Sequence, residues 1–203
     1  MTEKALKRSA LTVTAFASFL TPFMGSSVNL ALPSIGNEFG LNAVTLNWIV
    51  NSYMLSTAVF LLPAGRLGDI LGRKKVFTIG IFAFTLTMLL LAFTPGIGWL
   101  ISLRIIQGVA SAMIFGTNLA ILAAIFPAGE RGRAMGINVT AVYVGLASGP
   151  FLGGLLTQHF GWRSIFAFLV PMGILSLILI NRKIKDEWRD AHGERFDWQG
   201  SLV

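Results

Sequence analysis

Six long apolar runs limit what this chain can fold into. A helix needs about 20 mostly apolar residues to cross the hydrocarbon layer of a bilayer, and each run is about that long. The runs lack the period-two alternation of barrel strands. We therefore predict an all-α membrane protein with six transmembrane helices. The runs cover residues 11–32, 45–64, 76–94, 99–125, 135–157 and 164–181.

The composition agrees with a chain embedded in lipid and excludes several soluble classes. Charged residues make up 12% of the chain, whereas about a quarter of a typical soluble domain is charged. With no cysteine, there is no disulfide, thiolate nucleophile or cysteine metal site. His159 and His192 are too far apart in the sequence to suggest a zinc pair. Since no nucleophile–base pattern is present either, we expect no enzymatic activity, no cofactor and no metal.

Basic residues give the chain a net charge of +7, but their positions argue against nucleic-acid binding. They form short clusters between the apolar runs, where a nucleic-acid groove would need a continuous stripe. The N-terminus, the connections after the second and fourth runs and the tail carry fourteen of the 16 Lys and Arg. Basic connections stay in the cytoplasm. We therefore predict a multi-pass protein of the plasma (cytoplasmic) membrane, with both ends of the six-span unit cytoplasmic and the lipid bilayer as its partner.

The first run has an alternative interpretation as a signal peptide. Lys4, Lys7 and Arg8 precede an apolar stretch, as in secretory signals. The stretch continues to Pro33 without a clear A-x-A cleavage site, and five more runs follow. We interpret it as the first transmembrane helix.

An internal repeat predicts how the spans are related. Shifting the sequence by 89 residues aligns two sets of identical residues, one between the second and third runs and the other between the fifth and sixth. The sets lie on opposite faces of the membrane, which predicts two inverted three-helix repeats, an arrangement used by secondary transporters. The first set is Gly65, Leu67, Gly72 and Phe77, and the second is Gly154, Leu156, Gly161 and Phe166.

The connection between the second and third runs reads GRLGDILGRKK over residues 65–75. It resembles the signature loop of the major facilitator superfamily, G-x-L-[AG]-D-[RK]-x-G-R-[RK]. Ile70 stands where that family usually has a basic residue. A merely basic loop would explain the charges but not the aspartate and the spaced glycines. In the family this loop clamps the two halves of the transporter, so the resemblance implies a conformational latch at Gly65, Asp69, Gly72 and Arg73.

The fourth run contains a basic residue, Arg104, and Gln107 follows one helical turn later. An arginine within a span faces the bundle interior or a wet cavity by default, although it can also reach back to the interface. At helical spacing, Ser111, Phe115 and Asn118 share its face, so we predict a mostly polar stripe lining a cavity. The segment also resembles the R-x-x-Q-G motif of drug antiporters in the superfamily.

The fifth run contains Gly145, Gly149 and Gly153 at intervals of four residues. Such spacing leaves a bare helix face that allows close approach of another helix, and Pro150 removes one backbone hydrogen bond. The segment resembles the G-x-x-x-G-P-x-x-G-G motif of superfamily exporters. We predict that these four residues govern helix packing or gating.

The first two runs resemble the fourteen-span drug:proton antiporters of the superfamily. Residues 28–33 read VNLALP, which is similar to the family's V-N-V-A-L-P, but Met24 occupies the position of its aspartate. In the second run Tyr53 has the family's spacing from a preceding tryptophan. An interfacial aromatic on a polar helix face would give the same pattern. The predicted substrate and proton pathway comprises Arg104, Gln107, Asn118, Asn29, Tyr53 and Asn51.

None of the nine acidic residues lies in the middle of a run. Proton coupling usually needs a membrane carboxylate that gains and loses a proton, and arginine cannot replace it because it stays protonated. The proton carrier is therefore expected elsewhere, or the coupling differs from that of the subfamily. An uncompensated Arg104 would favour an anionic or electron-rich substrate, or need a carboxylate from a second half.

The six runs correspond to one half of a superfamily transporter. We expect a six-helix bundle at residues 1–182, a cytoplasmic linker with the start of a seventh span at 183–203, and a second half of six or eight spans as partner. The favoured function is export of small hydrophobic or amphipathic compounds by proton antiport. The alternatives are a facilitator or symporter of a metabolite or organic anion, and a non-transporting half that serves as an assembly or regulatory partner.

Overall fold

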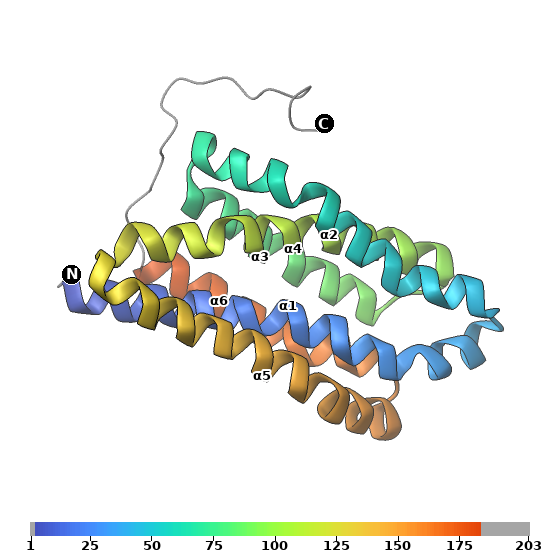
Figure 1. The fold of residues 1–203 in the computed structure, drawn as a ribbon. Helices are drawn as coiled ribbons and strands as arrows, with labels where there is room; N and C mark the ends of the chain where they lie inside the picture. The colour runs from blue at the N-terminus through green and yellow to red at the C-terminus, as the bar shows by residue number, and fades with distance from the viewer. Residues whose placement is uncertain (1–2, 184–203) are drawn as a thin grey trace.

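The computed structural model describes residues 3–183, and within that range the chain forms six α-helices and no strand (Figure 1). All six are long and apolar enough to cross a membrane, which confirms the predicted spans. The expected linker and seventh span lie outside the described residues. The helices are α1 (Glu3–Phe39), α2 (Ala43–Leu71), α3 (Arg73–Ala92), α4 (Ile97–Ile125), α5 (Ala128–Phe160) and α6 (Arg163–Lys183).

Most helices extend well past the apolar runs that predicted them. α1 continues through Pro33 to Phe39, and α5 starts at Ala128, seven residues before the predicted run. The segment 65–75, which we expected to be a loop, is almost entirely helical, and Gly72 alone separates α2 from α3. Hydropathy marks the part of a helix that lies in hydrocarbon, whereas the helix itself continues into the polar interface.

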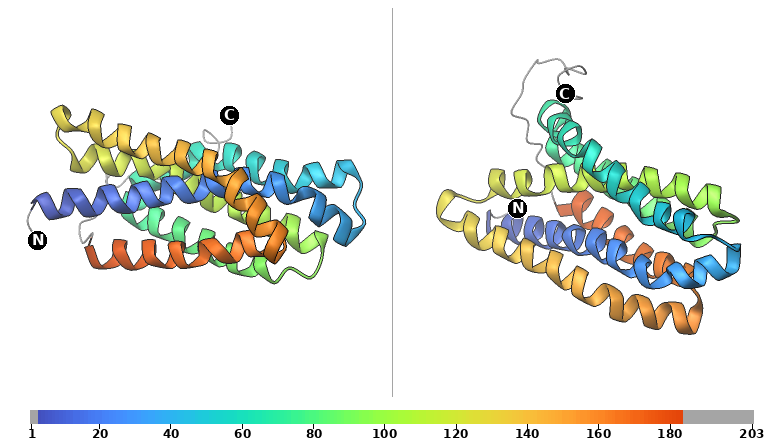
Figure 2. Two further views of the ribbon diagram at one scale, coloured as in Figure 1. Left: turned by 90° about the horizontal axis from the view of Figure 1, so that it is seen from below. Right: turned by 45° about the vertical axis from the view of Figure 1, so that its right-hand side comes forward.

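The two halves of the bundle follow an inverted repeat. Exchanging α1 with α4, α2 with α5 and α3 with α6 maps the main packed helix pairs onto one another: α1–α5 onto α2–α4, and α3–α4 onto α1–α6. Figure 2 shows these pairs from two further directions. The glycines aligned in the sequence, Gly72 and Gly161, take equivalent places with φ of 111° and 79°. Each donates its backbone N–H to the carbonyl four residues earlier, at Gly68 and Thr157.

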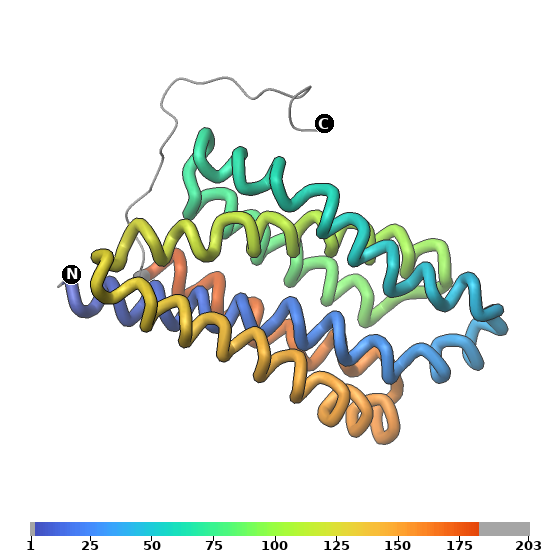
Figure 3. The backbone as a smooth tube through the Cα atoms, viewed as in Figure 1, coloured from blue at the N-terminus to red at the C-terminus, as the bar shows by residue number. Residues whose placement is uncertain are grey.

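The ends of the bundle differ in charge. The start of α1, the α2–α3 turn and the α4–α5 turn lie at one end, and the other three turns lie at the opposite end (Figure 3). At the first end Lys7 pairs with Glu130 at 3.0 Å. At the opposite end Arg163 pairs with Glu38 at 2.8 Å and donates to the carbonyl of Thr94 at 2.9 Å. The basic clusters at the start of α1, the α2–α3 turn and the α4–α5 turn therefore share one end of the described structure.

Glycines allow two parallel helix pairs to pack with their backbones close together. On α5, a Cβ at Gly145 would lie 2.6 Å from the Phe19 carbonyl oxygen, and one at Gly153 would lie 2.7 Å from Ser27 Cβ. On α4, a Cβ at Gly108 would lie 2.5 Å from the Tyr53 carbonyl oxygen. We call the close contact of α4 with α2 the α2–α4 seam. It was not predicted from the sequence.

Candidate functional site

A cavity of about 480 Å³ opens between α1, α2, α4 and α5. Its volume is within the range of small-molecule pockets. Its walls are mostly apolar, with a few polar groups at Asn29, Tyr53 and Thr57. The other lining residues are Thr21, Pro22, Gly25, Ser26, Met54, Ala58, Leu61, Phe115, Val142 and Leu146. The cavity can hold an apolar or amphipathic molecule and offers it a small number of orienting hydrogen bonds.

Tyr53 connects this cavity to the interior of the bundle. Its hydroxyl shares a hydrogen bond of 2.9 Å with Ser111 Oγ and lies 3.4 Å from the Thr21 carbonyl oxygen. Its ring stacks against the Arg104 guanidinium, whose central carbon lies 4.2 Å from the ring centroid. Tyr53 is therefore held by α1 and α4 and stands between the cavity and a buried cation.

Arg104 is fully buried between α2 and α4. Its Nε donates to the Ile49 carbonyl oxygen at 3.1 Å, and its Nη1 donates to Gln107 Oε1 at 2.6 Å. Within residues 3–183 the remaining nitrogen, Nη2, has no hydrogen-bond partner, and Gln107 Nε2 has none either. Arg104 takes part in none of the ion pairs found within the described range. The site thus holds a buried positive charge with unused donors.

The expected polar stripe on the fourth helix is buried and does not line the cavity. Of its five residues, Phe115 alone is among the lining residues, while Arg104, Gln107, Ser111 and Asn118 lie in the core. The physical reason is helix packing: at the α2–α4 seam α2 approaches Gly108 so closely that it covers Arg104 and Ser111, while α1 and α5 cover Asn118. Of the other predicted pathway residues, Asn29 and Tyr53 line the cavity, and Asn51 is exposed outside it.

Asn118 belongs to a polar cluster between α1, α4 and α5. Its Nδ2 donates to Ser18 Oγ at 2.5 Å, and Ser18 Oγ donates to Asn138 Oδ1 at 2.7 Å. All three residues are at most 3% exposed. Ser18 and Asn138 were not predicted from the sequence, although a polar residue within the fifth span was a signal that could have pointed to Asn138.

Replacing Asn118 with leucine is expected to destabilise the bundle by about 1–3 kcal/mol, because Ser18 and Asn138 would remain buried with fewer partners. The fall in thermal unfolding temperature in detergent measures this loss. The double variant Asn118→Leu/Asn138→Leu should lose less than the sum of the two single variants, since it removes both ends of the cluster. Additive losses would contradict the hydrogen-bonded cluster.

The residues of the predicted latch lie together at the basic end. Arg73 at the start of α3 donates from Nε and Nη2 to Asp69 Oδ1, each at 3.0 Å, and from Nη1 to the Ala120 carbonyl oxygen at 3.4 Å. Gly72 makes the turn between the helices. Gly65 lies beside α4, where a Cβ at Gly116 would approach its backbone nitrogen to 2.9 Å. The α2–α3 turn is thereby fixed to α4.

The predicted packing residues of α5 lie on two sides of that helix. Gly145, Gly149 and Gly153 are buried against α1, where Ser27 Oγ donates to the Gly149 carbonyl oxygen at 3.0 Å. A Cβ at Gly149 would overlap Ser26 Oγ. Pro150 is exposed on the other side. The glycines therefore determine how closely α1 and α5 approach.

The bundle is built from inverted repeats, and its cavity lies between α1, α2, α4 and α5, two pairs of helices that the repeat exchanges. This is the architecture of multi-pass membrane proteins of the secondary-transporter type. The sequence model described as "Major Facilitator Superfamily" matches residues 14–200. The chain belongs to this superfamily.

Several curated relatives are transport and resistance proteins. The chain is 35% identical to a riboflavin transporter of Clostridioides difficile, over 95% of this chain and 42% of the relative. It is 40% identical to multidrug resistance protein Stp of Mycobacterium tuberculosis, over 87% of this chain and 33% of the relative. It is 36% identical to a cephamycin export protein of Amycolatopsis lactamdurans, over 96% and 40%. The chain thus spans less than half the length of these relatives.

Solved structures share the fold. A proton:xylose symporter superposes with a TM-score of 0.79 at 17% identity, over 89% of this chain and 45% of that one. A peptide transporter superposes with a TM-score of 0.78 at 15% identity, over 91% and 42%. At this identity the likeness supports the six-helix architecture and carries no information on substrate.

Proposed function

We propose that the complete protein is a secondary active transporter that exports small hydrophobic or amphipathic compounds by alternating access and proton antiport. The cavity between α1, α2, α4 and α5 carries the proposal, because its walls are mostly apolar and its volume of about 480 Å³ suits a small molecule. The similarity to multidrug resistance and cephamycin export proteins supports the direction of transport. A second half of six or eight spans would close the cavity.

Each group of residues has a separate role in this proposal. Tyr53 and Asn29 contact the substrate, and the pair of Arg104 and Gln107 sits directly behind Tyr53. Asn118 belongs to the packing core, and Asn51 faces outward, where lipid or the second half would meet it. Gly65, Asp69, Gly72 and Arg73 form the latch at the basic end, which we assign to the cytoplasm of a plasma-membrane protein.

The proton carrier is expected to lie in the second half. Among the described residues that line the cavity, none is acidic. Arginine cannot release its proton at physiological pH, so Arg104 would act through its charge. A carboxylate from the second half that approached this charge would be favoured in its ionised form, and substrate binding could then displace it.

Filling the cavity tests this function. Ala58 lines the cavity from α2, and Ala58→Trp is expected to reduce export by the complete protein on the order of tenfold, because the indole would occupy the substrate's space. Efflux of a fluorescent lipophilic cation from preloaded intact cells is the measurement. Ala167→Trp, which adds the same ring to an exposed position of α6, is the matched control. Equal efflux by both variants would remove the cavity from the substrate path.

Transport of an organic anion or metabolite is a second candidate. The unused donors at Arg104 Nη2 and Gln107 Nε2 favour it, and one relative is a riboflavin transporter. Flux that is insensitive to a proton gradient and specific for an anionic solute would favour this candidate over antiport. Absence of flux from proteoliposomes that contain the complete protein would instead support a role as an assembly partner.

A further inference from the structure

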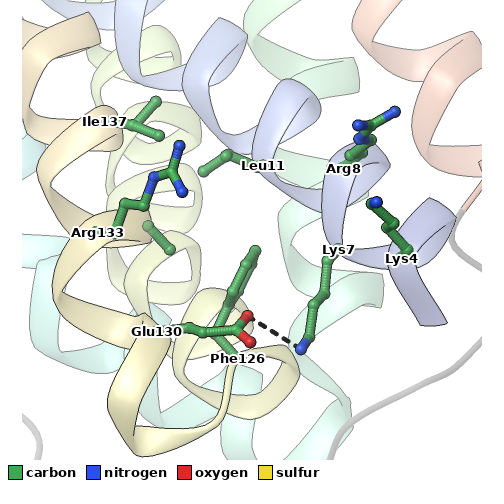
Figure 4. A pocket seen from close by; sticks show the side chains of 9 residues that line it. Lys4, Lys7, Arg8, Leu11, Phe126, Glu130, Arg133 and Ile137 are labelled. Carbon is green, nitrogen blue, oxygen red and sulfur yellow. Dashed lines mark ion pairs between the residues drawn. The ribbon is translucent and has the colours of Figure 1, made fainter.

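A second cavity, of about 340 Å³, lies at the basic end of the bundle, between the first turns of α1 and the α4–α5 turn (Figure 4). Four basic residues and one acidic residue surround it: Lys4, Lys7, Arg8, Arg133 and Glu130. Its remaining wall is apolar and includes Leu11, Phe126 and Ile137. This combination of a basic rim and an apolar wall is unlike the substrate cavity.

The rim carries positive charge that its own acid does not neutralise. Lys7 is engaged by Glu3 at 2.9 Å and by Glu130 at 3.0 Å. Among residues 3–183, by contrast, no ion pair holds Lys4, Arg8 or Arg133. Arg133 reaches from α5 toward Leu11 of α1 across the gap between the two helices (Figure 4). An anion placed here would meet three cations that no acidic residue of the described chain engages.

An apolar groove continues from this cavity along α1 and α5. The groove has a volume of about 400 Å³ and shares Ile137 with the basic cavity. Phe16 and Phe19 of α1, Ala141 and Val144 of α5 and Met172 of α6 line it. Because the basic cavity lies at the end of the helices and the groove runs toward their middle, the two form one amphipathic surface, charged at the interface and apolar at membrane depth.

We propose that this surface binds one anionic phospholipid, with the headgroup phosphate among Lys4, Arg8 and Arg133 and an acyl chain in the groove of α1, α5 and α6. Basic pockets at a helix end attract anionic headgroups electrostatically. The groove supplies the apolar area that an acyl chain requires and that a soluble anion would leave empty. The lipid would tie the α4–α5 turn to the start of α1, apart from the substrate cavity.

Lipid titrations followed by native mass spectrometry test the headgroup site. The protein is titrated with dioleoyl phosphatidylglycerol or dioleoyl phosphatidylcholine, which share acyl chains and differ in charge. We expect tighter binding of phosphatidylglycerol, and a loss of affinity on the order of tenfold in Lys4→Gln/Arg133→Gln. Lys74→Gln/Arg182→Gln removes the same charge from the same end outside the cavity and should bind like the unmodified protein. An equal loss in both pairs would overturn the proposal, since general surface charge would then explain the binding.

A second pair of variants separates a lipid from a soluble anion. Ala141→Phe narrows the groove without changing the charge and should weaken phosphatidylglycerol binding, whereas Ala167→Phe on the exposed side of α6 should leave it unchanged. Excess inorganic phosphate should fail to displace the lipid. Displacement by phosphate, together with unchanged binding in Ala141→Phe, would overturn the proposal in favour of a site for a free anion.

Discussion

Replacing Arg104 with methionine is expected to abolish export by the complete protein without lowering its thermal stability. The guanidinium is fully buried, and no acidic residue of the described chain pairs with it. A charge at membrane depth costs about 2.5–3.5 kcal/mol on insertion scales, and methionine of similar length removes that cost. We therefore expect this cost to offset the contacts of Arg104 with Ile49, Gln107 and Tyr53, so that its removal leaves stability unchanged.

The expected loss of transport follows from the unused donors. A charged hydrogen bond that forms only with substrate or with the second half contributes about 2–5 kcal/mol, so its removal should slow efflux at least about 30-fold. Arg104→Lys keeps the positive charge but replaces the planar guanidinium, which has several N–H donors in fixed positions, with a single ammonium group. Partial transport activity is therefore expected.

Two measurements on the same Arg104→Met preparation decide whether Arg104 acts in transport or stabilises the fold. Efflux from proteoliposomes reports function, and unfolding temperature in detergent reports stability. Efflux at the unmodified rate would exclude Arg104 from the pathway. Loss of efflux together with a strong drop in unfolding temperature would make Arg104 a structural residue, held by Ile49, Gln107 and Tyr53.

The six transmembrane helices were predictable because hydropathy determines each of them locally. Twenty apolar residues specify a span regardless of its neighbours, and the alignment of Gly72 with Gly161 in the sequence marks two equivalent turns. Helix ends were less predictable. Polar residues such as Glu38 continue α1 into the interface. The Glu38 carboxylate accepts a hydrogen bond of 2.7 Å from Trp162 Nε1. That contact joins residues far apart in the sequence and has no local signal.

The candidate site was predicted in part. Resemblance to drug antiporters pointed to Tyr53 and Asn29, and both line the cavity. Helical spacing also showed that Arg104 and Asn118 share a face of α4, but spacing alone cannot show what covers that face. Over Arg104 the cover is α2, brought close by Gly108 and Gly116 with Ala112 between them at intervals of four residues, and over Asn118 it is α1 and α5. This small-residue pattern was present in the sequence and was the missing signal.

Replacing Gly108 with leucine is expected to destabilise the bundle by about 3 kcal/mol, the upper end of the range for overpacking. The first added carbon would lie 2.5 Å from the Tyr53 carbonyl oxygen and 3.2 Å from the Thr57 backbone nitrogen. Backbone atoms within a helix cannot rotate aside as a side chain can, so α2 must move away from α4. Tyr53 would move with it and lose its contacts with Ser111 and Arg104, and efflux should fall together with stability.

A matched control lies on the same helix. A Cβ at Gly98, in the first turn of α4, would meet nothing within 4 Å, and Gly98→Leu should leave stability unchanged or raise it by up to about 1 kcal/mol through helix propensity. Gly145→Leu on α5 should repeat the Gly108 result, because its Cβ would lie 2.6 Å from the Phe19 carbonyl oxygen in the pair related by the repeat. Unfolding temperatures of the three variants compare the two seams directly. A Gly108 variant as stable as the Gly98 variant would mean that α2 and α4 do not pack backbone to backbone, and the burial of Arg104 would then lose its explanation.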